Sequence, residues 1–484
     1  MNYDVILDEN KKALYPDKEY FFRPSQRYPE YKFSEISDNK NYIYDMVRNL
    51  FILRQYDKEN IGTESWNPLG EIIKPGNKVV IKPNLVMDVN LGGAGEECLY
   101  THPSVIAPII DYTIIALKGK GEIIVGDAPM QECDFEKLIY DSGYKQLIEF
   151  YQNKGINIIL KDFRGVYSIR KNGLLYTYEN DKTEEIIVDL KDESEFETLT
   201  DNQIKNLRIT NYDPRQLNLH QKRGKHEYAI AKDLITADVI INVPKPKTHR
   251  KAGVTISLKN MIGGNCRKEY LPHHMNGDAE SGIGDEYRKK NYIKVILNRY
   301  LDKINIARSE NRYLYAKIYK IILEILYGFK GIQKDKTFEG SWSGNCTISK
   351  TIIDINKILM YAKKDGSLSK TPQRKMLIIA DMIISGEKDG PLRPLPKKVN
   401  VLAMGENQYS FDKVIALLMG CKIDKLATLN QADASKSSLK INCDKEIKII
   451  SNNKLNGKNI AEIKSEDKWY FEPIEEWKDI FYEN

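Results

Sequence analysis

Five short apolar runs, each bounded by turn residues, predict buried strands along the chain. They lie at 78–82, 122–125, 237–243, 375–380 and 398–403. The runs are almost continuous in apolar and β-branched residues, which is typical of parallel strands that are covered on both faces. The pattern therefore predicts a largely parallel sheet.

Helical stripes alternate with these runs. One covers 102–117, opens with Pro103 near its first turn, and has Thr101 in a position that fits the N-cap. Another covers 410–420, with Ser410 as a capping residue and Gly420 at its end. Alternating strands and helices predict an α/β fold with a largely parallel sheet, flanking helices and right-handed crossovers.

Two regions interrupt the alternation. Residues 163–210 contain a predicted β-hairpin that turns at Asn172-Gly173, followed by acidic, polar sequence that we interpret as a surface excursion. Residues 288–334 carry a helical pattern that breaks near 309–311 and predicts an inserted basic helical pair. The predicted division is listed in chain order: an N-terminal extension at 1–73, an α/β core at 74–287 and 338–430, a helical insertion at 288–337 and a C-terminal appendage at 431–484.

Composition sets the class of protein. Among the 484 residues, 41% are hydrophobic and 29% charged, which excludes disorder, a fibre or a membrane bundle. The net charge of +6 is too small to predict nucleic acid binding. The N-terminus lacks the pattern of a signal peptide and no run is long enough to span a bilayer, so we expect a cytoplasmic protein.

The basic excess is local. Residues 288–334 hold 12 Lys plus Arg and 3 Asp plus Glu, a net +9, so the remainder of the chain is slightly acidic. An anionic surface is therefore an expected partner for this segment alone, through peripheral contact with a membrane. The alternative is a helix docked on its own core with a solvated basic edge.

Polar residues follow the predicted strands. In an open α/β sheet, ligands bind beyond the carboxyl ends of the strands, so these residues are the first candidates. They are Lys82 and Asn84 after the first strand, Asp127 after the second, Lys245, Lys247 and His249 after the third, Asp381 and Glu387 after the fourth, and Glu406 and Asn407 after the fifth. The alternative for any one of them is an ordinary turn residue.

The densest polar constellation runs from 245 to 286. It contains His249, His273, His274, Lys259, Asn260 and Asp285. Imidazole and carboxylate in one segment suit a divalent metal such as Zn, Mn, Fe or Ni, or proton transfer near neutral pH. The spacing matches no metal-ligand signature, and the adjacent pair His273 and His274 does not easily face one ion from a regular strand. A hydrogen-bonded polar loop is the alternative.

Several cofactor classes lack their motifs. No GxGxxG follows a strand and no GxxxxGK[ST] occurs, so neither NAD nor ATP is supported. The six cysteines are scattered without a CxxC pair, so no iron–sulfur cluster or zinc ribbon is predicted. Lys259 lies directly before the segment 260–264, whose glycines could present backbone amides to an anion; a solvated loop is the alternative.

The order of these segments resembles the domain-of-unknown-function family 362. The matching stretches are 74–86, 101–103, 125–129, 244–249, 253–260, Asp381, 386–392 and 411–412, and they cover roughly 74–425. The set 66–69, 270–274, 284–287 and 340–345 looks like a branch found among bacterial surface-polysaccharide genes. Some members of the family carry a ferredoxin-like cysteine cluster that this chain lacks. Cys346 stands where that branch implies an acidic residue.

Two functions are expected. The favoured one is a metal-assisted enzyme that acts on a small anionic or sugar-derived metabolite in surface-glycan biosynthesis, by proton or group transfer. In it, Lys245, Lys247 and Lys259 neutralise oxyanions and His249 is the general acid or base. The remaining roles are Asn260, Asp127, Asp381 and Glu387 as further catalytic residues, Lys82, Asn84 and His102 as substrate-binding residues, and His273, His274 and Asp285 as metal ligands. The alternative is a non-catalytic binding or assembly protein that recognises a glycan carrier or partner at a membrane surface.

Overall fold

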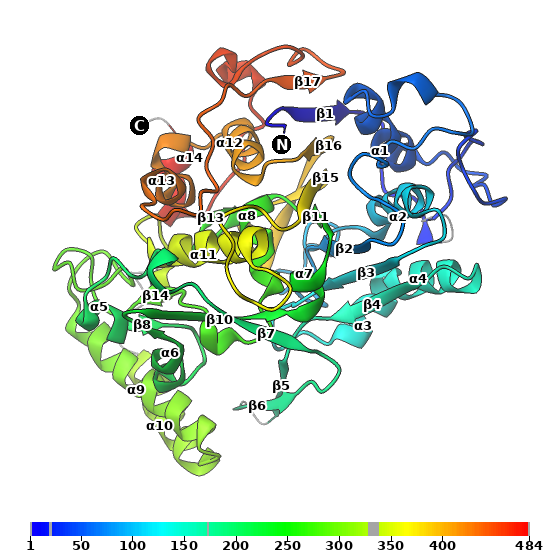
Figure 1. The fold of residues 1–484 in the computed structure, drawn as a ribbon. Coiled ribbons are helices and arrows are strands. Elements are labelled where there is room, and N and C mark those ends of the chain that lie inside the picture. Colours follow the sequence, from blue (N-terminus) through cyan, green and yellow to red (C-terminus); the bar gives the residue numbers. More distant parts are fainter. Residues whose placement is uncertain (1, 19–21, 172–173, 328–337, 483–484) are drawn as a thin grey trace.

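A large mixed sheet forms the centre of the molecule, flanked by helices on both faces (Figure 1). The computed structural model describes residues 2–18, 22–171, 174–327 and 338–482. Five neighbouring strands are parallel, in the order β15 (Lys375–Asp389), β11 (Val239–Val243), β2 (Lys78–Pro83), β3 (Glu122–Asp127) and β4 (Ile158–Asp162). This confirms the predicted α/β class with its largely parallel sheet.

The other margin of the sheet contains two antiparallel pairs and ends in a parallel pair. Strand β16 (Arg393–Gly405) pairs antiparallel with β15 and with β1 (Val5–Glu9), and β1 pairs parallel with the short β17 (Ile449–Ser451) at the edge. The fourth and fifth predicted strands are therefore the two arms of one long hairpin, and the fifth is not part of the parallel set. Because β16 runs in the opposite direction, Glu406 lies away from the carboxyl ends of the parallel strands and accepts hydrogen bonds from Tyr56 and Arg54.

Alternate residues of the strands pack on opposite faces of the sheet, as the period of two requires. Val79, Ile81 and Val125 lie in one hydrophobic cluster, and Val80 and Ile124 lie in the other. The first face carries α1 (Tyr42–Leu53), α2 (Pro103–Leu117), α3 (Phe135–Ser142) and α4 (Tyr144–Asn153). The second carries α7 (Lys232–Thr236), α8 (Ser257–Asn260), α11 (Thr347–Tyr361), α12 (Gln408–Met419), α13 (Ala427–Ala434) and α14 (Lys478–Phe481).

Two helix starts differ from the prediction. The N-cap of α2 is His102, whose ring accepts from the Ser104 amide, while the Thr101 hydroxyl donates to Val243 O at 2.7 Å. Helix α12 begins one turn earlier than expected because the Asn407 side chain caps it by accepting from the Ser410 amide. In both cases a neighbouring polar residue takes the capping position.

Smaller elements surround the carboxyl edge of the sheet. They are the hairpin of β5 (Val166–Lys171) and β6 (Leu174–Glu179), the sheet of β7 (Glu185–Asp189), β10 (Lys225–Ala231) and β9 (Gln221–Lys222), the pair of β8 (Leu207–Arg208) and β14 (His274–Met275), the hairpin of β12 (Lys247–His249) and β13 (Gly253–Thr255), and the helices α5 (Asp201–Lys205) and α6 (Pro214–His220). The predicted turn at Asn172-Gly173 lies outside the described residues, and β5 and β6 pair antiparallel on either side of it.

The predicted helical pair is present as α9 (Tyr292–Ser309) and α10 (Tyr313–Tyr327), which lie apart from the central sheet in Figure 1. Buried residues of both helices pack with Leu174 of the β5–β6 hairpin. Among the described residues, no helix combines the length and the apolar character needed to cross a membrane.

Candidate functional site

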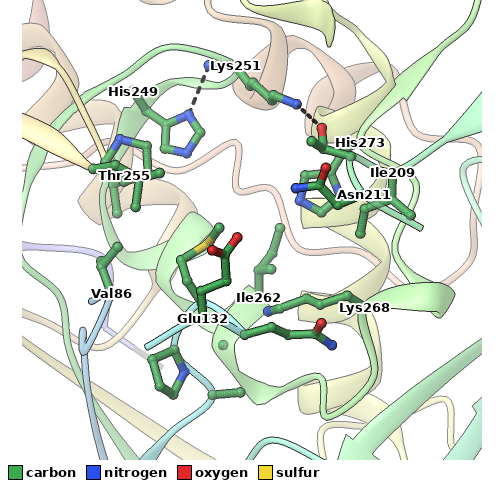
Figure 2. A pocket seen from close by; sticks show the side chains of 18 of the residues that line it. Val86, Glu132, Ile209, Asn211, His249, Lys251, Thr255, Ile262, Lys268 and His273 are labelled. Atoms are coloured by element: carbon green, nitrogen blue, oxygen red, sulfur yellow. Dashed lines mark hydrogen bonds between the residues drawn. The ribbon is translucent and has the colours of Figure 1, made fainter. Parts of the chain in front are cut away.

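A cavity of about 320 Å³ lies at the carboxyl ends of β2 and β3 (Figure 2). This is the edge at which open α/β sheets bind ligands. Its floor comes from residues that follow the strands and from α8, and its walls come from the β12–β13 hairpin, the β5–β6 hairpin and the loop after β8. The polar lining includes Asn84, Asp127, Glu132, Asn211, His249, Lys251, Thr255, Lys259, Asn260, Lys268, His273, Arg308 and Glu339.

A buried ion pair supports the floor. Lys82 Nζ lies 2.7 Å from Asp127 Oδ1, and the other carboxylate oxygen of Asp127 accepts from the Leu85 amide at 2.7 Å. Lys82 is fully buried beneath the cavity, whereas Asp127 contributes to its lining. Lys82 therefore orients Asp127 and does not itself reach the cavity.

Gly263 makes this arrangement possible. A Cβ at that position would lie 2.0 Å from Asp127 Oδ1 and 2.9 Å from Lys82 Nζ. The Gly263 carbonyl also accepts from the Ala128 amide at 2.9 Å, so the backbone approaches the ion pair closely. Only glycine leaves room for the pair at this distance.

His249 presents a hydrogen-bond donor to a ligand. Its Nδ1 accepts from the backbone amides of Lys251 at 3.0 Å and Ala252 at 3.1 Å, so the proton of the neutral ring is on Nε2. Burial, with Lys259 and Lys251, holds the pKa of His249 well below its usual range, so the ring is neutral at pH 7. The ring nitrogen left for a ligand is thus an N–H.

His273 has the opposite arrangement. Its Nδ1 lies 2.8 Å from the Leu271 carbonyl, which only accepts, so Nδ1 carries the proton and Nε2 holds a free lone pair. Burial and the nearby Lys251 hold the pKa of His273 well below its usual range. Figure 2 shows the His249 and His273 rings on two sides of the cavity. Together they offer one acceptor and one donor.

Lys259 is positioned by a short, strongly supported helix. The Asp412 carboxylate of α12 accepts from the Ser257 amide at 2.8 Å and the Leu258 amide at 3.1 Å at the start of α8. Asn260, one residue after Lys259, donates to Asn242 Oδ1 of β11 at 2.7 Å. These bonds fix α8 against the sheet and direct Lys259 toward the cavity that it lines.

Four further cations line the cavity and were not singled out from the sequence: Arg250, Lys251, Lys268 and Arg308. Lys251 donates to the Thr210 hydroxyl at 2.9 Å, and Arg308 extends from α9 and donates to the Leu175 carbonyl at 3.3 Å. Lys268 lies at the opposite side of the view from His249 in Figure 2. The clustering of basic residues between 245 and 268 was the available signal for Lys251 and Lys268; no local pattern could indicate Arg308, which reaches the site from the insertion.

Positive charge is under-compensated here. Burial, with Lys268 and Lys82, lowers the pKa of Lys259 to about 7, and burial lowers that of Lys268 to about 8. Among the acidic lining residues, Asp127 is paired with Lys82, and Glu132 with Arg170 at 2.7 Å. The third, Glu339, acts on the nearby Lys251 and is outnumbered by the lysines and arginines of the lining. The charge balance of the cavity therefore favours an anion.

Several lining residues also hold a buried polar atom without a hydrogen-bond partner. Within the described ranges these atoms are Asn84 Oδ1, Gln131 Nε2, Tyr212 Oη, Thr255 Oγ1 and Asn260 Oδ1. Native proteins satisfy nearly all such groups, so their gathering around one cavity indicates a polar ligand.

The other strand-end residues form a separate buried cluster. Lys245 Nζ lies 2.9 Å from Asp381 Oδ2, and Tyr15 donates to Asp381 Oδ1 at 2.6 Å. The His102 amide donates to the same carboxylate at 2.9 Å, and the His102 ring stacks on Tyr15 with centroids 4.0 Å apart. Lys247 donates to the Leu99 carbonyl. None of these side chains lines the cavity, so the predicted set divides into two groups.

Glu387, Asp285 and His274 also lie elsewhere. Glu387 is inside the long strand β15 and accepts from the Glu472 amide at 3.0 Å. Asp285 caps α11: its Oδ2 accepts from the Thr347 amide at 2.7 Å and the Cys346 amide at 3.0 Å. The family branch implies an acidic residue at position 346, where this chain has Cys346. Asp285 supplies a carboxylate at this helix start instead. His274 is buried beside a smaller pocket.

The predicted metal ligands are not brought together. In the part of the chain that the structure describes, no group of three or more His, Cys, Asp or Glu side chains could hold a metal ion. The lining groups with lone pairs suited to a metal include the Nε2 of His273 and the carboxylates of Glu339 and Glu132, of which Glu132 is paired with Arg170. A metal at this cavity would need further ligands from substrate or water.

Comparisons with known proteins add a family. The model described as Domain of unknown function (DUF362) matches residues 79–174 and 188–417. The thylakoid-associated protein sll1697 of Synechocystis sp. is 23% identical over 226 residues, which cover 45% of this chain and 51% of that protein. The chain thus spans about half the length of this relative. No solved structure matches.

Proposed function

This chain belongs to the DUF362 family, a domain of unknown function, and we propose that it is an enzyme that binds a small anionic metabolite and transfers a proton on it. One observation carries the proposal: His249 and His273 line one cavity in opposite tautomers. A donor and an acceptor facing one ligand are the two groups needed to move a proton and to stabilise the charge that results.

The cations of the cavity hold the substrate in this proposal. Lys251, Lys259, Lys268 and Arg308 surround the space, and an anionic group among them restores charge to Lys259 and Lys268. A bound anion also raises the pKa of His273 toward its ordinary value, because it offsets the nearby Lys251. Substrate binding therefore strengthens the base at the moment it is needed.

The proton-transfer step uses both rings. His273 Nε2 takes a proton from a carbon next to a carbonyl; the C–H bonding pair becomes the C=C bond of an enolate, and the carbonyl π pair moves to oxygen. The Nε2–H of His249 donates to that oxygen as its charge develops. The proton on His273 then returns to the substrate at the same or a neighbouring carbon, so no oxidant or reductant is consumed.

A sugar-derived substrate, a surface-glycan pathway and a cytoplasmic location are also part of this proposal. Their support is the likeness of 66–69, 270–274, 284–287 and 340–345 to the polysaccharide-associated branch, together with a cavity of a size suited to a sugar phosphate. Metal assistance stays a prediction, for which His273 and Glu339 are the candidate ligands.

Solvent exchange tests the reaction without knowledge of the exact substrate. The protein is incubated in D₂O with a panel of sugar phosphates and keto acids, and deuterium incorporation at carbon is followed by NMR. The variant His273→Asn keeps a donor for Leu271 O but removes the base, so exchange should fall by about 10²–10⁴-fold. Added imidazole should restore part of the rate.

The matched control is His220→Asn, which changes a histidine outside the cavity that contacts Glu227. It should exchange at the wild-type rate. Exchange that survives His273→Asn, or a loss that imidazole leaves unchanged while the protein remains folded, would contradict the assignment of the base. Tight anion binding with no exchange on any panel member would favour the non-catalytic alternative.

A further inference from the structure

Helix α10 has two apolar faces, and within the described ranges 2–18, 22–171, 174–327 and 338–482 only one of them is packed. Ala316 and Leu323 are buried in a cluster with Leu297 and Ile304 of α9. Leu314, Ile318, Ile321 and Ile325 are exposed, with 71%, 45%, 50% and 64% of their surface accessible. We call these four residues the α10 stripe.

The α10 stripe is continuous. Its members are spaced by four, three and four residues, which places them on one side of a helix, opposite the buried positions. The stripe extends over about 17 Å of helix, since each residue adds about 1.5 Å. Single exposed leucines are common on soluble proteins, but an aligned row of four aliphatic side chains marks an interaction surface.

The charge around the stripe identifies its partner. Lys317, which lies beside Leu314 and Ile321 on the helix surface, is exposed. Arg312 lies just before the helix, pairs with Glu310 and has about half its side chain exposed. The insertion at 288–334 contains 12 basic and 3 acidic residues. A second copy of the chain would bring equal positive charges together, whereas an anionic bilayer would neutralise them.

We propose that the α10 stripe inserts into the interfacial region of an anionic phospholipid bilayer, with the basic residues of the insertion at the headgroups. An apolar helical face flanked by lysine and arginine is the pattern of helices that lie in the plane of the interface. The same helical pair supplies Arg308 to the cavity, so a docked insertion holds the cavity at a fixed orientation to the membrane.

Vesicle sedimentation of the full chain tests this surface. Vesicles of phosphatidylcholine with roughly a third phosphatidylglycerol should bring down the wild-type protein, and vesicles of phosphatidylcholine alone should not. The double variant Ile318→Asp/Ile321→Asp should lower the partition coefficient by about tenfold or more, because it places charge on the inserting face. Sodium chloride should weaken the wild-type binding.

The matched control is Ile159→Asp, an isoleucine of β4 with 46% exposure that lies outside the insertion. Its vesicle binding should equal that of the wild type. Equal binding by the double variant would overturn the proposal, as would a protein that ignores anionic vesicles or a stripe-dependent dimer in sedimentation velocity. Because exchange on soluble substrates does not use the stripe, the double variant should retain it, which separates this proposal from the proposed function.

Discussion

His249 and His273 line the same cavity, but the backbone holds their protons on opposite ring nitrogens. Two amides donate to Nδ1 of His249, whereas Nδ1 of His273 donates to a carbonyl. A single substitution at each position can therefore preserve the local hydrogen bond while it removes only the group that faces the ligand. This property makes the two roles separable by experiment.

We expect His249→Asn to slow exchange with little change in substrate affinity. The Asn side-chain oxygen can accept from the Lys251 and Ala252 amides, but no donor remains at the position of Nε2. Loss of one donor to a developing oxyanion lowers kcat by about 10²–10³-fold. Steady-state exchange rates and calorimetric affinities, measured on the same preparations, provide the check. Imidazole should not rescue this variant; rescue would show that His249 is the base.

Anion binding should weaken as pH rises from 6 to 9. The pKa of Lys259 is about 7 and that of Lys268 about 8 in the folded chain, so both lose their charge in this window. Sulfate is a suitable probe, because its own charge is constant over the range. Calorimetry in buffers of different ionisation enthalpy should show proton uptake near pH 8. Lys259→Met should reduce the uptake and lower affinity by about tenfold at pH 6.

The free energy of unfolding should change with pH in the direction opposite to anion affinity. A lysine with a lowered pKa binds fewer protons when folded than when unfolded, so without anions its contribution to stability rises between about pH 7 and pH 10. Urea denaturation should show a steeper rise for wild type than for Lys259→Met. The variant Lys225→Met, at a partly exposed ion pair with Glu227, is the control and should retain the wild-type slope. Identical slopes for all three proteins would contradict the lowered pKa.

The sequence predicts the architecture of the core well, because buried parallel strands have a local signature. It also places Asn84, Asp127, His249 and Lys259 at the edge where the cavity lies. The second half of β15 is polar and lacks the apolar pattern of a buried strand, so the sequence places Glu387 in a loop after the strand. In the structure this half continues as one arm of the hairpin with β16. Antiparallel pairing with β16 follows from that hairpin and could not be read from apolar runs.

Long-range pairs explain the remaining differences. Lys245 looks like a site lysine after β11, but its partner Asp381 lies 136 residues away and draws it into a buried cluster. Likewise, Asp285 follows two histidines in the sequence and so resembles a metal ligand. In the fold, its carboxylate accepts from the backbone amides at the start of α11 instead. Arg308 enters the cavity from the insertion. Local spacing in the sequence identifies which side chains could serve a site. It does not show which of these side chains are already engaged by partners far away in the chain.

Gly263→Ala should destabilise the protein. The added methyl group would overlap Asp127 Oδ1, and overpacking of this kind costs about 1–3 kcal/mol. Separation of the buried Lys82–Asp127 pair would raise the cost to about 3–5 kcal/mol. In the control Gly264→Ala, the added methyl group is close only to a flexible methyl of Leu234, so the loss of unfolding free energy should be smaller. Chemical denaturation of both variants decides; an equal loss would mean that the ion pair relaxes without cost.

The variant Asp285→Asn distinguishes a capping carboxylate from a metal ligand. Asn cannot accept from Met275, Cys346 and Thr347 as the carboxylate does, so the unfolding free energy should fall by about 1–3 kcal/mol. Asp278→Asn, which changes a neighbouring carboxylate with one amide contact to Ser281, should lose less. If capping is the whole role of Asp285, the loss is the same with EDTA as with added Zn²⁺ or Mn²⁺. A stability gain from metal that wild type shows and Asp285→Asn lacks would instead make Asp285 a ligand, since a metal bound only to the folded state stabilises it.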